Sequence, residues 1–400
     1  MRILMFSWEY PPHLVGGMGA HVAALVPALA AQGVEVAVVT PRWKGGPEVE
    51  PLRANAMVYR VQTPVADPSN FFADTQQTNL TLEHFAQNLW GQGGGFDIIH
   101  AHDWLVSFAA EALKKLHKTP LIATMHATER GRGRGQLYGE MANAINGAEW
   151  WLTYEAWRVI ATSRFMAREV RDYFQLPSDK IFVIPNGVDV HRFDAIPENE
   201  LTAIRNQWAE PHVRIVFFIG RVQHEKGVEV LLDAAAKILV YDQGVKFIIA
   251  GTGTLLSSLR DRVDSLGIGD QVLLPGYVSD AMRDQLYRIA DVAVFPSLYE
   301  PFGIVALEAM AAHCPVIVSD VGGLGEVVDD GVTGIKVEAG RSDLLAQAIM
   351  RSLHDRRAAM EMADHAFSVV CHEYTWDQIA RATIELYQDV SNLRSNTPWD

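Results

Sequence analysis

The sequence predicts an α/β fold made of two doubly wound domains, each a Rossmann-like parallel sheet with helices on both faces. Short apolar runs with the character of buried strands alternate with longer stretches of helical character. Strands separated by helices of ten or more residues are typical of βαβ units in a parallel sheet. This alternation begins at residue 2 and again at residue 213, which indicates two domains.

The first half of the chain carries apolar segments that we interpret as buried strands. They cover residues 2–7, 35–40, 96–101 and 120–125. Helices are expected at about 20–32 and 105–117. A glycine-rich loop, Gly16-Gly17-Met18-Gly19, precedes the first of these helices. In an open α/β sheet, the loops after strands are where ligands bind.

The second half repeats this order, and its strands end in loops that contain glycine. Strands are expected at residues 213–220, 246–250, 272–274, 292–297 and 316–319. We place an N-terminal domain at residues 1–190 and a second domain at residues 191–375. A C-terminal helix at about 376–391 is expected to pack back on the first domain.

Composition narrows the class of protein. With 400 residues and a hydrophobic fraction of 49%, the chain can form two or three cores. No apolar run reaches the ~18–20 residues of a membrane span, and the apolar start at residues 1–8 has the pattern of a core strand rather than a signal peptide. Two cysteines without a C-x-x-C motif favour a reducing compartment, so a cytoplasmic protein is expected. A net charge of −14 disfavours nucleic-acid binding, and the oligomeric state stays open.

The most informative segment runs from residue 299 to residue 308. Glu300 and Glu308 flank an apolar stretch that follows the expected strand at 292–297. Glu300 is therefore expected at the carboxyl edge of the sheet, and Glu308 two turns into the next helix. Carboxylates at this edge can accept hydrogen bonds from sugar hydroxyls, while free helix N–H groups can face a phosphate. The pairing indicates a sugar nucleotide as the ligand.

Two cations are expected at the same edge. Arg221 and Lys226 follow the strand at 213–220. Fixed positive charges there could neutralise a departing diphosphate, and such preorganised charge often dominates catalysis. An ordinary solvated loop is the alternative interpretation. Because Glu300 is expected on the same edge, we favour the functional interpretation.

The loop at Gly16 and Gly17 is neither a P-loop nor a complete G-x-G-x-x-G motif. Its expected use is a close approach of bare backbone to a phosphate. A tight turn that needs a positive φ angle is the alternative. Taken alone, the loop is weak support for a nucleotide site.

Polar residues also follow two expected strands of the first domain. His100, His102 and Asp103 lie at the end of one strand. His126 ends the next strand. The H-x-H spacing suits a metal, but the sequence offers no obvious third and fourth ligands, so structural histidines with satisfied hydrogen bonds are expected. Asp103 either caps the next helix or faces the ligand.

In combination these residues resemble the retaining family 4 glycosyltransferases of the GT-B fold, including glycogen-synthase-like enzymes. The resemblance covers nearly the whole chain. It is most specific in the E-x7-E of Glu300 and Glu308 and in the pair Arg221 and Lys226. Two further motifs carry it, namely Asn186-Gly187-Val188-Asp189 and Gly322-Gly323 with Glu326, Gly331 and Gly334. The resemblance implies two Rossmann-like domains that face each other across a deep cleft.

The resemblance also implies roles for residues of the second domain. Arg221 and Lys226 bind the diphosphate of the donor. Glu300 contacts hydroxyls of the donor sugar, and Glu308 contacts the ribose. Further donor-binding residues, near the sugar, phosphate and base, are Phe302, Gly303, Ile304, Val305, Tyr277 and Val278.

Residues of the first domain receive roles in the same way. The backbone at Gly16 and Gly17 approaches the donor phosphates. Asp103 and His126 match the glycogen-synthase segments that hold an aspartate and a histidine beside the donor glucose. One departure is Leu14, which stands where bacterial glycogen synthases carry a lysine.

The implied function is a retaining transfer of a hexose, expected to be glucose, from a UDP-, ADP- or GDP-sugar to a glucan or oligosaccharide. No cofactor or metal is expected, because the sequence holds no D-x-D motif for a metal-bridged diphosphate. Other acceptors remain open, namely a small polyol, a sugar phosphate or a precursor of a cell-surface glycan or lipid. A sugar-nucleotide epimerase and a non-catalytic sugar-nucleotide sensor are the rival functions.

Overall fold

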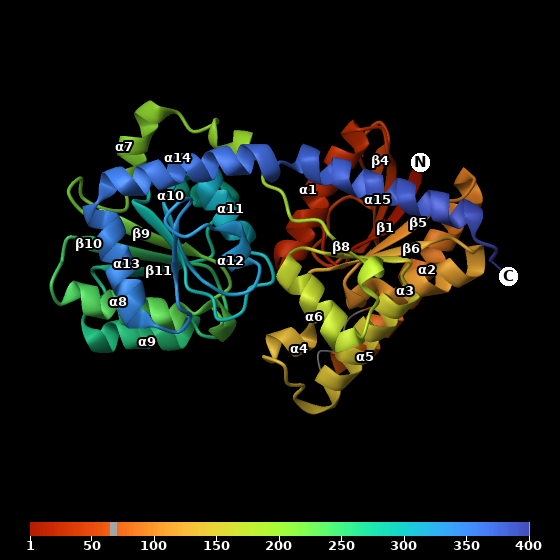
Figure 1. The fold of residues 1–400 in the computed structure, drawn as a ribbon, viewed down its shortest axis with the longest axis horizontal. Coiled ribbons are helices and arrows are strands. Elements are labelled where there is room, and N and C mark those ends of the chain that lie inside the picture. The colour runs from red at the N-terminus through yellow and green to blue at the C-terminus, as the bar shows by residue number, and fades with distance from the viewer. Residues whose placement is uncertain (65–69, 400) are drawn as a thin grey trace. The chain divides into compact units, whose positions relative to one another are not determined.

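The computed structural model describes residues 1–64 and 70–399, and the chain divides into two compact units. Unit 1 comprises Met1–Gly187 and Trp376–Asp400, and unit 2 comprises Val188–Thr375. Each unit is a layered α/β body with a sheet between helices (Figure 1). The predicted fold class, two doubly wound α/β units with Rossmann-like sheets, is confirmed.

Within the described residues, unit 1 contains an eight-stranded sheet in the order β3-β4-β2-β1-β5-β6-β7-β8. Its neighbouring strands run parallel, except that β3 pairs antiparallel with β4 at one edge. The strands are β1 (Arg2–Phe6), β2 (Glu35–Pro41), β3 (Val49–Arg53), β4 (Ala56–Val61), β5 (Ile98–His102), β6 (Leu121–Met125), β7 (Arg158–Ala161) and β8 (Ile181–Val183).

Both faces of this sheet are buried, because successive side chains of a strand point to opposite faces. In β1, Ile3 and Met5 enter one core, whereas Leu4 and Phe6 enter the other. The helices on the first face are α1 (Gly17–Ala31) and α15 (Trp376–Asn396). Those on the second face are α2 (Phe71–Gly93), α3 (Ser107–His117), α5 (Gly139–Glu155) and α6 (Arg164–Phe174).

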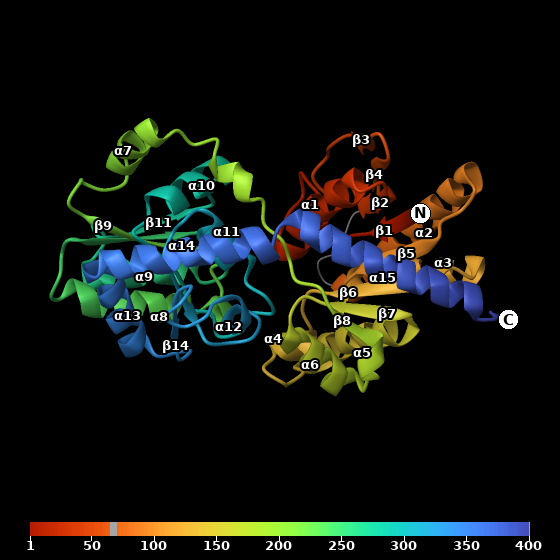
Figure 2. The same ribbon diagram turned by 45° about the horizontal axis from the view of Figure 1, so that its top comes forward.

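Helix α15 belongs to unit 1 although it comes from the far end of the chain, and it lies along the sheet in both views (Figures 1 and 2). Ile379, Tyr387 and Val390 are buried in the core that α15 shares with α1. Each such apolar side chain stabilises the fold by about 1.5–3 kcal/mol when it is fully buried. The helix continues to Asn396, beyond the predicted end at residue 391.

Unit 2 contains a six-stranded parallel sheet, as far as the structure describes it, in the order β11-β10-β9-β12-β13-β14. Its strands are β9 (Arg214–Ile219), β10 (Val245–Ala250), β11 (Val272–Gly276), β12 (Val292–Phe295), β13 (Val316–Ser319) and β14 (Ile335–Val337). Its helices are α7 (Glu198–Asn206), α8 (Val228–Leu239), α9 (Leu256–Leu266), α10 (Asp280–Ile289), α11 (Ile304–Ala311), α12 (Leu324–Val327), α13 (Ser342–His354) and α14 (Arg356–Glu373).

The strand orders locate the place where each sheet can bind a ligand. In unit 1 the chain builds outward from β1 in one direction and from β5 in the other. In unit 2 the same reversal lies between β9 and β12. Ligands of open α/β sheets bind beyond the carboxyl ends of the strands at such a reversal. The loops after these four strands are therefore the candidate ligand-binding loops.

The helices of the described residues include none with the length and apolar character that a membrane span requires.

Candidate functional site

The loops after β9 and β12 are joined by backbone contacts. The carbonyl oxygen of Glu225 accepts the N–H of Leu298 at 2.8 Å. Gly227 has a φ of +66°, and a Cβ at this position would lie 1.9 Å from the carbonyl oxygen of Pro296. Only glycine permits this close approach of two backbones. The junction holds Lys226, which precedes this glycine, against the loop after β12.

Lys226 and Glu300 form an ion pair at this junction. The Nζ atom of Lys226 lies 2.7 Å from Oε2 of Glu300, and the hydroxyl of Ser297 donates to the same oxygen at 3.3 Å. The two charged side chains are only 18% and 10% exposed, so water screens their attraction less than it screens a surface pair. Sequence reasoning placed both residues on one edge, and the structure brings them into contact.

Arg221 lies in the same loop and also has a carboxylate partner. Its Nη2 atom is 3.1 Å from Oε1 of Glu225, and its side chain is 42% exposed. Both predicted cations are therefore present at the β9 edge, with Arg221 the more solvent-exposed of the two. Because each cation is already paired, a diphosphate that binds here has to share or displace a carboxylate.

Glu308 lies in a buried cluster of charged and polar groups. Its Oε1 accepts a hydrogen bond from Arg192 at 3.0 Å, and its Oε2 accepts one from the hydroxyl of Tyr287 at 3.2 Å. Arg283 adds a second guanidinium at 3.9 Å. Burial, together with the charge of Glu308, raises the pKa of Tyr287 well above its ordinary value, so this hydroxyl stays a donor. Each carboxylate oxygen keeps a lone pair that a ribose hydroxyl can use.

The partners of Glu308 were missed by sequence reasoning. Arg192 stands three residues after Asp189, the last residue of the motif at 186–189, and this proximity is the signal that could have identified it. Arg283 and Tyr287 lie one turn apart on α10, a helix that carried no recognised motif.

The start of α11 depends on two glycines. Gly303 has a φ of +100°, and a Cβ there would lie 2.6 Å from the Leu324 side chain. A Cβ at Gly323 would lie 2.2 Å from the carbonyl oxygen of Pro301. Among the described residues, no side chain caps the N-terminus of α11. The N–H of Ala306 donates to the carbonyl oxygen of Gly303 at 3.0 Å, so the amides of Ile304 and Val305 are the ones at this helix start that can meet an anionic group.

The other predicted donor-binding residues differ in what they offer. Phe302 and Val278 are buried in the core of unit 2, so only their backbone can meet a ligand. Ile304 and Val305 are half-buried and pack on the same core. Tyr277 follows β11 and is 78% exposed, so its ring is free to stack on a base.

In unit 1, the loop after β1 already holds a carboxylate. Oε2 of Glu9 accepts the N–H groups of Val15 at 2.8 Å and Gly16 at 3.0 Å. The predicted approach of the Gly16 backbone to a phosphate stays a prediction, and it would require this amide to exchange Glu9 for the phosphate. Gly17 begins α1. The alternative prediction, a tight turn that needs a positive φ angle, is wrong for Gly16, because its φ is −155°. The glycine that packing requires is Gly19, where a Cβ would lie 2.7 Å from that of Glu9.

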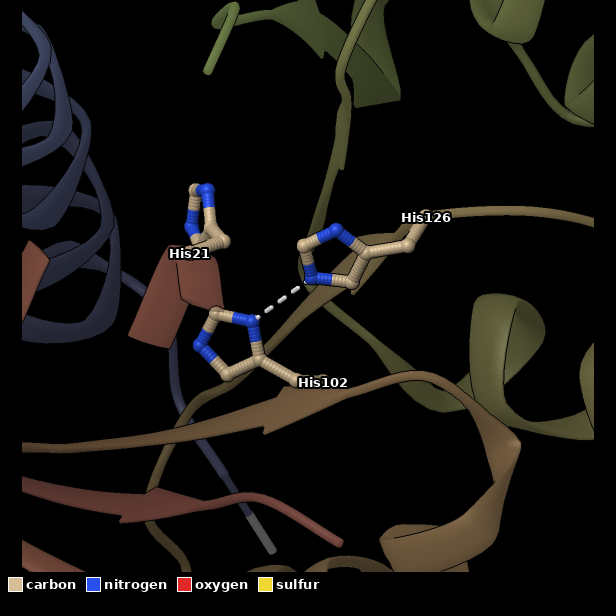
Figure 3. Close-up of side chains that lie close together, drawn as sticks. All are labelled: His21, His102 and His126. Atoms are coloured by element: carbon tan, nitrogen blue, oxygen red, sulfur yellow. Dashed lines mark hydrogen bonds between the residues drawn. The ribbon is translucent and has the colours of Figure 1, made fainter. Parts of the chain in front are cut away.

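Three histidines gather at the ends of β5 and β6 and near the start of α1 (Figure 3). Nδ1 of His102 faces Nε2 of His126 at 3.0 Å, and ligand nitrogens of these rings and of His21 all lie within 4.8 Å of one another. Nδ1 of His21 lies 2.6 Å from Oδ1 of Asn186. Burial lowers the pKa of His21 and His126 to about 3, and it lowers the pKa of His102 well below its ordinary value. The three rings are therefore neutral near pH 7.

His100 and His102 differ in their hydrogen bonds. Nδ1 of His100 lies 2.7 Å from the hydroxyl of Tyr387, and its Nε2 lies 2.7 Å from that of Thr124. The prediction of a satisfied structural histidine is confirmed for His100. It is wrong for His102, whose buried Nε2 has no hydrogen-bond partner in residues 1–64 and 70–399. No third nitrogen ligand was obvious from the sequence, whereas in the structure the ring of His21 lies close to those of His102 and His126.

Asp103 adopts an unusual backbone conformation directly after β5. Its φ of 60° and ψ of 176° fall in a region that is essentially restricted to glycine, and such strain, of about 1–3 kcal/mol, is concentrated at functional sites. Its Oδ1 accepts the backbone N–H of His126 at 2.7 Å. In the part of the chain that the structure describes, its side chain makes no capping bond to the following 3₁₀ turn, so the capping prediction is wrong. Burial raises the pKa of Asp103 to about 6.

The candidate residues thus form two groups, one in each unit. The group in unit 2 joins a lysine–glutamate pair to exposed helix amides and a tyrosine ring, which suits a sugar, a diphosphate and a base. The group in unit 1 joins a buried aspartate to a histidine and its neighbouring imidazoles. Both groups lie at the strand reversals.

Comparisons with known proteins agree with this chemistry. Residues 15–192 match the family described as Glycosyltransferase Family 4, and residues 202–369 match Glycosyl transferases group 1. The chain is 36% identical over 395 residues to an uncharacterized glycosyltransferase of Methanocaldococcus jannaschii, an alignment that covers 97% of this chain and 98% of that protein. It is 34% identical over 404 residues to a glycogen synthase of Mycobacterium tuberculosis, with 97% and 94% covered.

A solved structure shares the fold. Sucrose-phosphate synthase of Thermosynechococcus elongatus superposes with a TM-score of 0.84 at 24% sequence identity, covering 97% of this chain and 98% of that one.

Proposed function

The chain belongs to the family 4 glycosyltransferases, and we propose that it transfers glucose to a glucan or oligosaccharide with retention of the anomeric configuration. Hexosyl transfer from a nucleotide sugar follows from the family. The choice of glucose, the acceptor and the stereochemistry are the proposal.

The contact between Lys226 and Glu300 is the observation that carries the proposal. It places one cation and one carboxylate at the β9–β12 reversal, 2.7 Å apart. The ammonium group suits the charge that develops on a departing phosphate. The carboxylate can accept hydrogen bonds from the hydroxyls of the donor sugar. Arg221, at the same edge, adds a second positive charge for the diphosphate.

Retention is supported by the way Glu300 is held. Lys226 and Ser297 both donate to its Oε2, which favours a role as a fixed hydrogen-bond acceptor over a role as a nucleophile. We therefore favour attack on the face that the phosphate leaves, with the departing phosphate taking the proton of the acceptor hydroxyl. Water has to be excluded during this step, because hydrolysis is the competing reaction.

The glucan acceptor is supported by Asp103 and His126 and by the likeness to a glycogen synthase. A turnover screen tests it, with UDP-, ADP- and GDP-glucose as donors and malto-oligosaccharides, small polyols and sugar phosphates as acceptors. Elongation of malto-oligosaccharides is the expected result. Transfer to a sugar phosphate alone would contradict the glucan acceptor and leave the family assignment unaffected.

Glu300 and Glu308 are expected to have separable roles. Glu300→Gln should mainly lower kcat, because its carboxylate meets the sugar, and Glu308→Gln should mainly raise the donor KM, because its carboxylate meets the ribose. Titration calorimetry with UDP and ADP distinguishes them. The glutamine side chains keep the shapes of both sites, and Glu361→Gln, an exposed residue of α14, is a matched control. Weaker diphosphate binding in Glu300→Gln than in Glu308→Gln would reverse the assignment.

Activity is expected to survive the removal of divalent metals. Lys226 and Arg221 supply positive charge at the diphosphate edge, where other transferases use a metal. Rates measured after treatment with EDTA should equal those with added Mg²⁺ or Mn²⁺. Activity that is lost in EDTA and returns with either ion would show that the two cations are insufficient.

A further inference from the structure

We propose that His21, His102 and His126 form a binding site for a transition-metal cation of the Zn²⁺ class, and that its occupation inhibits the transferase. The binding stands on the geometry of unit 1 alone. The inhibition also rests on the proposed function and on the role beside the donor glucose that the family resemblance implies for His126.

The spacing of the ring nitrogens fits such a cation. Zinc binds imidazole nitrogens at about 2.0–2.1 Å, so two ligands of a tetrahedral site lie about 3.3 Å apart. The facing nitrogens of His102 and His126 are 3.0 Å apart, and the three ligand nitrogens lie within 4.8 Å of one another (Figure 3). A side-chain rotation that moves a nitrogen of the third ring by at most about 1.5 Å brings all three nitrogens to the separations of a tetrahedral site.

A hydrogen bond to its other ring nitrogen prepares His21 as a ligand. Nδ1 of His21 donates to the Asn186 side-chain oxygen at 2.6 Å in the tautomer that leaves Nε2 with its lone pair. This arrangement, with one ring nitrogen tied to an oxygen and the other open, is typical of metal-ligating histidines. The facing nitrogens of His102 and His126 share one hydrogen bond, which needs a single proton between them. A cation bound by both nitrogens would take the place of that proton.

His102 supplies an independent observation. Its side chain is fully buried, yet its Nε2 has no hydrogen-bond partner in the described ranges, 1–64 and 70–399. A buried polar atom without a partner is unfavourable, and protein folds retain few of them. A cation beside His126 would bind Nδ1 of this ring, and Nε2 would then carry the N–H. No hydrogen bond to a described residue therefore fixes His102 in a tautomer that excludes binding through Nδ1.

The site also has an open side. His126 is half-buried, whereas His21 and His102 are fully buried. A cation would enter past His126 and keep a fourth position for water, as three-histidine zinc sites do. Imidazole suits Zn²⁺, Ni²⁺ and Cu²⁺, whereas Mg²⁺ and Ca²⁺ prefer oxygen ligands. A bound cation would occupy His126 and so displace the donor sugar.

The binding is tested with Zn²⁺ and Co²⁺ on full-length protein freed of metal. Competition with a chromophoric chelator should show one equivalent of tightly held Zn²⁺, and Co²⁺ should give the strong visible absorption of a tetrahedral site. His21→Gln and His102→Gln should each weaken Zn²⁺ binding at least tenfold. His212→Gln, which changes an exposed histidine of unit 2, should leave it unchanged. Thermal melts of the metal-free variants identify any that fail to fold.

The inhibition is tested by transfer assays with added Zn²⁺ or Mg²⁺. Zn²⁺ should lower turnover at the concentration at which it binds, Mg²⁺ should have no effect, and His21→Gln should shift the inhibition curve to higher Zn²⁺. A lack of stoichiometric binding, or binding that both variants leave intact, would overturn the site. Stoichiometric binding without inhibition would overturn the regulatory half. Since binding is measured without substrate, an enzyme that transfers no sugar would contradict the proposed function and leave the metal site standing.

Discussion

Lys226→Ala is expected to lower kcat by roughly two to three orders of magnitude, the scale for losing one preorganised charge contact. The ammonium group lies at the β9–β12 reversal beside Glu300, where the charge of the departing phosphate develops. A group that acts mainly in the transition state changes kcat more than the donor KM. Steady-state rates with UDP- and ADP-glucose measure both constants.

A stability control is needed, because Lys226→Ala also leaves Glu300 without its ion-pair partner. Glu300 is only 10% exposed, so the single variant should melt a few degrees lower than the wild type. The double variant Lys226→Ala with Glu300→Gln removes both charges and should regain stability without regaining activity. Lys237→Ala, on the exposed face of α8, should match the wild type in both respects. Turnover of Lys226→Ala within a few-fold of wild type would rule out a role at the leaving group.

Asp103→Asn is expected to lower kcat by about two orders of magnitude while the fold is kept. The oxygen of the new amide can still accept the N–H of His126, which Oδ1 of Asp103 accepts at 2.7 Å. Only the negative charge that we propose to face the donor glucose is lost. Circular dichroism and thermal melts, measured together with the rates, separate a loss of catalysis from a loss of folded protein.

The matched control is Asp172→Asn, which makes the same change at an exposed position of α6. It should leave rates and melting temperature unchanged. If Asp103→Asn loses activity only in proportion to lost folded protein, the aspartate is structural. If it keeps near wild-type rates, the charge does not act on the substrate.

The unit 2 site was largely readable from the sequence. Short apolar runs predicted β9 and β12, and in a parallel sheet the ends of adjacent strands meet at one edge. That rule placed Lys226 beside Glu300 without any knowledge of their contact. The glycines were also informative, since Gly227 and Gly303 have the positive φ angles and close contacts that their loops require.

The unit 1 site was harder to read, because its partners come from tertiary packing. His21 lies in α1, where a histidine among apolar residues looks like an ordinary helix position. Its approach to His102 depends on how α1 packs on the sheet, which no local pattern encodes. Glu9 was missed for a similar reason, since only the folded loop brings it to the Gly16 amide. The end of α15 at Asn396 was misplaced because polar residues near the C-terminus gave no stop signal.

Proton NMR of the product formed from UDP- or ADP-glucose and a malto-oligosaccharide tests the central claim most directly. Both donors carry glucose in the α configuration, so retention predicts an α-linked product from the first turnover onward. Spectra taken early in the reaction should already show the α-linkage. A β-linked product would contradict retention and the role assigned to the Lys226–Glu300 pair.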